Sequence, residues 1–99
     1  GEADMARSKK LNAKRRVQFV YHGTAGQEVF LSGEFNAWAT DQKPMLDKLG
    51  NGQFVATCVL PAGEYQYKFL VDGLWVLDSS NPNFVINEFG SHNSVLKVE

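Results

Sequence analysis

The sequence predicts an all-β protein, an antiparallel β-sandwich with a flexible N-terminal tail. From Val17 onward the apolar residues alternate with a period of two, and turn signals recur about every 8–12 residues. No apolar repeat of helical spacing has a useful length. The 99 residues, 43% of them hydrophobic and 12% aromatic, supply one domain with one core. We therefore expect six or seven short strands packed as two sheets.

The N-terminal segment differs from the rest of the chain. We assign residues 1–16 to a basic flexible tail and residues 17–99 to the folded domain, and residues 1–4 read as a cloning remnant before a natural start at Met5. Six basic residues and no acidic ones lie between Arg7 and Arg16. Residues 17–99 carry nine acidic residues against four basic ones. An acidic domain is a poor nucleic-acid binder, so we expect no nucleic-acid partner.

The first half of the domain contains three predicted strands. Residues 17–22 form the first strand, and residues 28–32 form the second after a glycine-containing turn. Residues 33–43 are expected to be a long loop. The segment Gly50-Asn51-Gly52 is a strong turn signal, and residues 53–60 follow it as the third strand.

The second half is predicted around a hairpin. Residues 64–71 are a strand rich in aromatic residues, and Asp72-Gly73 is the preferred pair for a type I′ turn into residues 74–77. Residues 83–93 are expected to be irregular, and residues 94–98 to form the last strand. Alternation along the fourth strand places Tyr65, Tyr67, Phe69 and Val71 on the core face and turns Lys68 outward.

Two tryptophans are the first functional candidates. Trp38 lies in the polar loop and Trp75 follows the hairpin turn, and strand alternation buries neither ring. The flat C–H faces of sugars stack on indole, and nearby Asn, Gln and Lys side chains hydrogen-bond sugar hydroxyls. A partly buried structural role for either tryptophan is the alternative.

The sequence lacks the residue patterns that several classes of function require. The single cysteine, Cys58, allows neither an intramolecular disulfide nor a cysteine-based zinc site, and we expect it to be a buried apolar thiol. The carboxylates and the two histidines are scattered along the sequence, so we expect no enzyme, metal or cofactor. No apolar run reaches the roughly 20 residues of a membrane span, and no signal-peptide core is visible. We expect a cytoplasmic protein with no membrane partner.

Three blocks of the sequence resemble a known family. Residues 29–38 (VFLSGEFNAW) resemble the V-x-L-x-G-x-F-N-x-W pattern of carbohydrate-binding module family forty-eight. Residues 60–75 (LPAGEYQYKFLVDGLW) and 90–96 (GSHNSVL) resemble its L-P-x-G-x-Y-x-Y-K-F-x-V-D-G-x-W and G-x-x-N-S-V-L patterns. The resemblance covers about residues 17–98. It implies an immunoglobulin-like β-sandwich that binds glycogen or starch without catalysis, as in the glycogen-binding domain of the AMP-activated protein kinase beta subunit and the N-terminal modules of branching enzymes and isoamylases.

The resemblance also implies a set of binding residues. In the kinase branch of the family, two tryptophans, a lysine, an apolar residue on a late loop, a hydroxyl residue and an asparagine hold the glucan. By motif position these are Trp38, Trp75, Lys68, Phe89, Ser91 and Asn93. The ring of Phe89 would stack on the sugar or pack inward.

Two functions remain open at this point. The first is a carbohydrate-binding module for α-1,4-glucan, with glycogen, starch or a maltooligosaccharide as the partner. The second is a docking module of a kinase-regulatory or glycogen-metabolising complex, which would use its exposed tryptophans as interface anchors. A protein partner would bind through the basic tail or a sandwich face.

Overall fold

The computed structural model describes residues 13–99. This part of the chain contains seven strands and one short 3-10 helix, at Glu34–Asn36. The strands are β1 (Lys14–His22), β2 (Val29–Gly33), β3 (Gln53–Pro61), β4 (Gly63–Val71), β5 (Leu74–Val76), β6 (Phe84–Ile86) and β7 (His92–Val98). The predicted all-β fold is confirmed.

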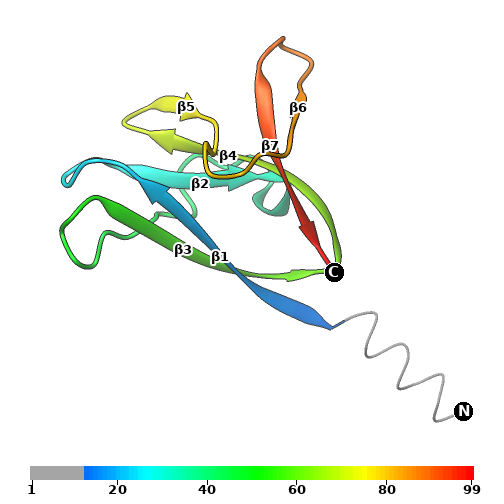
Figure 1. The fold of residues 1–99 in the computed structure, drawn as a ribbon, viewed down its shortest axis with the longest axis horizontal. Coiled ribbons are helices and arrows are strands. Elements are labelled where there is room, and N and C mark those ends of the chain that lie inside the picture. The colour runs from blue at the N-terminus through cyan, green and yellow to red at the C-terminus, as the bar shows by residue number, and fades with distance from the viewer. Residues whose placement is uncertain (1–12) are drawn as a thin grey trace, which may run out of the picture.

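The strands form two antiparallel sheets, seen as two layers in Figure 1. One sheet pairs β1 with β3, and the other has the order β2-β4-β7-β6, with β5 paired to β4. Isolated bridges join Pro44 to Phe30 and Leu46 to Val55. The chain between β2 and β3 therefore connects the edges of the two sheets.

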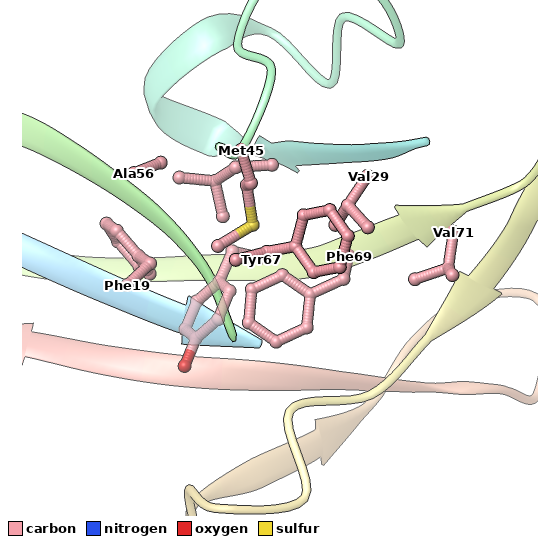
Figure 2. Close-up of a cluster of buried hydrophobic side chains, with 9 residues drawn as sticks. Phe19, Val29, Met45, Ala56, Tyr67, Phe69 and Val71 are labelled. Carbon is pink, nitrogen blue, oxygen red and sulfur yellow. The ribbon is translucent and has the colours of Figure 1, made fainter. Parts of the chain in front are cut away.

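The core lies between these sheets, as the alternation predicts. Phe19 from β1 packs with Tyr67 and Phe69 from β4 (Figure 2). Phe54 from β3 belongs to the same cluster, and all four residues are at most 4% exposed. The rings of Phe19 and Tyr67 pack edge to face, with their centroids 5.0 Å apart. Such a pair adds about 0.5–1.5 kcal/mol to the stability gained from burial.

The hairpin between β4 and β5 has the predicted turn. Asp72 and Gly73 have φ values of 48° and 81°, and a type I′ turn requires positive φ at both central positions. The Asp72 carboxylate accepts a hydrogen bond from the Glu28 backbone N–H at 2.8 Å. Asp72 is therefore explained by the fold.

Two boundaries differ from the prediction. Strand β1 begins at Lys14, so Lys14–Arg16 belong to the domain and pair with the end of β3 through register positions 59–61. Exposed strand residues contribute backbone hydrogen bonds whatever their side chains, so three basic residues do not mark the end of a strand. The remaining part of the predicted tail, residues 1–12, lies outside the described residues. The segment 83–93 is not irregular throughout, because it contains β6 and the start of β7.

Candidate functional site

An open groove of about 910 Å³ brings all six predicted binding residues together. It is bordered by the loop after β2, by β5 and by the loop between β6 and β7. Its lining includes Trp38, Lys68, Trp75, Phe89, Ser91 and Asn93. Sequence reasoning did not single out five further lining residues, which are Glu34, Gln66, Ile86, Asn87 and Glu88.

Trp38 is held by a tight turn at the end of β2. Ala37 and Trp38 adopt the left-handed conformation, with φ values of 54° and 58°. The Trp38 N–H donates to the Gly33 carbonyl at 2.8 Å. The Asn36 side chain accepts from Gly33 N–H and donates to the Leu31 carbonyl, each at 3.0 Å. These bonds offset the cost of two non-glycine residues at positive φ and fix the direction in which the Trp38 side chain leaves the backbone.

Trp75 forms a second wall of the groove from strand β5. It is paired with Leu70, so its side chain lies on the opposite side of the sheet from the core residues Phe69 and Val71. The side chain is 47% exposed. The Trp38 and Trp75 rings meet at 75° with their centroids 6.3 Å apart. The two indoles therefore form a corner with apolar surface facing in two directions.

Lys68 lies on the groove face of β4. The prediction that it points away from the core is confirmed, but it is not solvated, because the residue is only 9% exposed. The overlying loop covers it, and its ammonium group donates to Ser91 Oγ at 2.8 Å. A lysine ammonium has three donors, so two remain for another acceptor in the groove.

The floor of the groove is a chain of polar contacts across β4 and β7. Asn93 is 7% exposed, and its amide donates to Gln66 Oε1 at 3.0 Å. The backbone N–H of Gln66 in turn donates to Glu34 Oε1 at 2.6 Å. Gln66 could have been found from the sequence, because it lies two residues before Lys68 and so shares its face of the strand.

Phe89 stands at the rim, on the loop between β6 and β7. Its side chain is 84% exposed, so the alternative that it packs inward is wrong. The Asn87 carboxamide oxygen accepts hydrogen bonds from the backbone N–H groups of Phe89 and Ser91, each at 3.0 Å. The loop is thus a closed turn organised by Asn87, which no sequence pattern had marked.

A second polar cluster lies beneath the crossover from β5 to β6 and is separate from the groove lining. The Tyr67 hydroxyl donates to Asp78 Oδ2 at 2.6 Å and accepts from the Asn81 amide at 3.1 Å. Burial, and next the hydrogen bond to Asp78, raise the pKa of Tyr67 well above its ordinary value. The backbone N–H of Asp78 donates to Ser94 Oγ at 3.0 Å. This cluster fastens the crossover to β4 and β7.

Three other sequence expectations concern chemistry outside the groove. Cys58 is half-buried, and burial raises the pKa of its thiol although Lys43 opposes the effect. Across residues 13–99, no group of three histidine, cysteine or acidic side chains is placed to hold a metal ion. Within the same range, no helix has the length and apolar character needed to cross a membrane.

Comparison with known proteins identifies the family. Residues 15–99 match the family described as the glycogen recognition site of AMP-activated protein kinase. The chain is 39% identical over 98 residues to human 5'-AMP-activated protein kinase subunit beta-2, which covers 99% of this chain and 35% of that protein. It is 40% identical over 96 residues to subunit beta-1 from Sus scrofa, covering 97% of this chain and 75% of that sequence. The chain spans about a third of the human relative. It belongs to the family of glycogen recognition sites of AMP-activated protein kinase.

Proposed function

We propose that the groove binds α-1,4-glucan, such as glycogen, starch or a maltooligosaccharide, and that the domain itself is not catalytic. Trp38 and Trp75 stack on sugar rings, and Phe89 contacts the sugar from the rim. Lys68, Ser91 and Asn93 hydrogen-bond the hydroxyls. The observation that carries the proposal is that two part-exposed indoles and a floor of amide and ammonium groups line one groove. Membership of a glycogen-recognition family supports a carbohydrate ligand.

The angle between the indoles favours a curved glucan. An α-1,4-linked chain turns at each linkage, so successive sugar rings present their C–H faces in different directions. Two platforms inclined at 75° match such a chain better than they match the flat ribbon of a β-1,4-glucan. An open, solvent-exposed groove gains little binding free energy per sugar, so we expect dissociation constants of order 10–1000 µM.

A protein-docking role is the second candidate, and a separate surface supports it. A hollow of about 540 Å³ lies over β3 and the segment before it, where Leu46 and Leu49 are 52% and 79% exposed. Exposed apolar side chains in one hollow are typical of interaction surfaces. A partner in a cytoplasmic kinase complex would use this face or the basic N-terminal segment, leaving the groove free for glucan.

The experiment that tests the glucan proposal is calorimetric titration of the domain with maltoheptaose, with cellohexaose as the sugar control. Trp75→Ala should weaken binding at least about 30-fold, corresponding to the roughly 2 kcal/mol of a central aromatic contact. Leu74→Ala is the matched control, because Leu74 lies on the same hairpin, is 71% exposed and faces the other side of the sheet. If the folded wild-type domain shows no binding to maltoheptaose at millimolar concentration, glucan binding is refuted and docking becomes the leading function.

A further inference from the structure

We propose that Asn87 is the positioning residue of the glucan groove: it holds the 87–91 loop in its binding shape and orients the Asn93 amide. The inference rests on the proposed glucan function. Asn87 acts through the residues that contact sugar, and on the Trp38 side of the groove the Asn36 side chain holds the turn.

The loop depends on Asn87 for its shape. The side-chain oxygen of Asn87 accepts from Phe89 N–H and Ser91 N–H, each at 3.0 Å. Its backbone N–H donates to the Ser91 carbonyl at 2.7 Å, and its carbonyl accepts from Gly90 N–H at 3.1 Å. One residue therefore closes both ends of the turn.

Apolar packing contributes little to this loop. Phe89 is 84% exposed, and Glu88, Gly90 and Ser91 are exposed as well. Without buried side chains, a five-residue segment keeps one conformation only through its hydrogen bonds. The bond from Lys68 to Ser91 Oγ fastens one point of the loop and does not restrain the Phe89 backbone.

Asn87 also sets the direction of the buried amide on the groove floor. Its side-chain nitrogen donates to Asn93 Oδ1 at 3.1 Å, and Asn93 Nδ2 donates to Gln66 Oε1 at 3.0 Å. A carboxamide has two donors on one side and an acceptor on the other. The donor from Asn87 therefore fixes the orientation of the Asn93 carboxamide, and with it the positions of the donor and the acceptor that sugar hydroxyls would meet. Asn87 thus links the loop and the floor as one preorganised surface.

Loss of Asn87 should weaken sugar binding while the domain remains folded. In Asn87→Ala the loop loses both side-chain acceptor bonds, and ordering it again on binding costs conformational entropy. We expect a loss of about tenfold in maltoheptaose affinity with an unchanged melting temperature. Asn87→Asp keeps the acceptor for both N–H groups, but it replaces the donor to Asn93 by a carboxylate oxygen that faces Asn93 Oδ1. It should therefore recover only part of the affinity.

A double-mutant cycle separates positioning from a direct sugar contact. If Asn87 acts by placing Phe89 and Ser91, then Asn87→Ala should cost little in a Phe89→Ala, Ser91→Ala background, at most about two- to threefold through Asn93. A full tenfold loss in that background would mean that Asn87 binds sugar itself and would overturn the proposal.

Amide hydrogen exchange without sugar supplies a readout that does not depend on the proposed function. Asn87→Ala should speed exchange at Phe89 and Ser91 at least about tenfold and leave the core strand β4 unchanged. Unchanged exchange at these two amides would overturn the inference even where wild-type glucan binding is intact. If the wild-type domain fails to bind maltoheptaose but exchange is faster in Asn87→Ala, then the glucan role is refuted. Only the role of Asn87 in holding the loop would then remain.

Discussion

Adding one methyl group at Gly33 should destabilise the domain and weaken the groove at the same time. A Cβ at this position would lie 2.6 Å from the Gln66 carbonyl oxygen, 2.8 Å from Tyr67 Cβ and 2.9 Å from Phe35 Cζ. The Gln66 carbonyl oxygen is a backbone atom of β4 and Tyr67 Cβ is bonded directly to that backbone, so neither can rotate away. Strands β2 and β4 must therefore separate. The φ of Gly33 is −171°, which any residue adopts, so the cost is steric. Overpacking of this kind costs about 1–3 kcal/mol.

Urea unfolding of Gly33→Ala, followed by circular dichroism, measures this cost. In a thermal melt of the same variant, the melting temperature should fall by about 4–8 °C for each kcal/mol in a domain of this size. Maltoheptaose affinity should fall too, because the Gly33 carbonyl holds the Trp38 N–H. A decrease in unfolding free energy below about 0.5 kcal/mol would refute the steric argument.

Ser32→Ala is the matched control on the neighbouring residue. Ser32 is fully buried, and its hydroxyl has no hydrogen-bond partner among the residues the structure describes. Removing an unpaired buried hydroxyl relieves a desolvation penalty, so this variant should be unchanged or up to about 1 kcal/mol more stable. Opposite effects of adding and removing one heavy atom at adjacent buried positions would identify crowding at Gly33 as the cause.

Three further outcomes are expected. Because burial and the Asp78 bond raise the pKa of Tyr67, its protonated form stabilises the fold; this contribution is complete below the unfolded pKa of about 10 and declines as the pH rises above it. The free energy of unfolding measured in urea should therefore fall more steeply above about pH 10 for the wild type than for Tyr67→Phe. The Cys58 thiol, whose pKa burial raises, should react with a thiol reagent much faster in urea than in the folded domain. Lys68→Met keeps the aliphatic part of the side chain and removes the ammonium group. Maltoheptaose affinity should then fall about tenfold, the equivalent of about 1.4 kcal/mol, while the domain stays folded. Unchanged affinity would show that the ammonium group only holds Ser91 in place and does not bind sugar.

Much of the fold follows from local patterns in the sequence. Alternation identified the core face of β4, and the Asp72-Gly73 pair identified its hairpin, because both signals depend on neighbouring residues alone. The three-residue strand β6 was missed, since so short an apolar run between asparagines carries almost no periodicity. Its pairing with β7 joins residues 84–86 to residues 92–94 across a loop, and the local pattern does not express such a pairing.

The lining of the groove could be predicted only where a residue matches a family motif or shares a strand face with one that does. Lys68 satisfies both conditions, and Gln66 satisfies the second. The burial of Lys68 was not predictable, because the loop that covers it comes from a segment 23 residues further along the chain. Glu34 reaches the backbone of Gln66 across 32 residues, and alternation carries no information on such a contact.

The two sides of the groove are held in place by different means, and this difference separates stability from binding. Trp38 is anchored to Gly33, a buried residue at the end of β2 that packs against β4, so a change there affects the core and the groove together. The backbone N–H groups of Phe89 and Ser91 are held by hydrogen bonds to Asn87, in a loop that covers none of the hydrophobic core residues. Variants at Gly33 should therefore lose stability and sugar affinity in parallel, whereas variants at Asn87 should lose affinity alone.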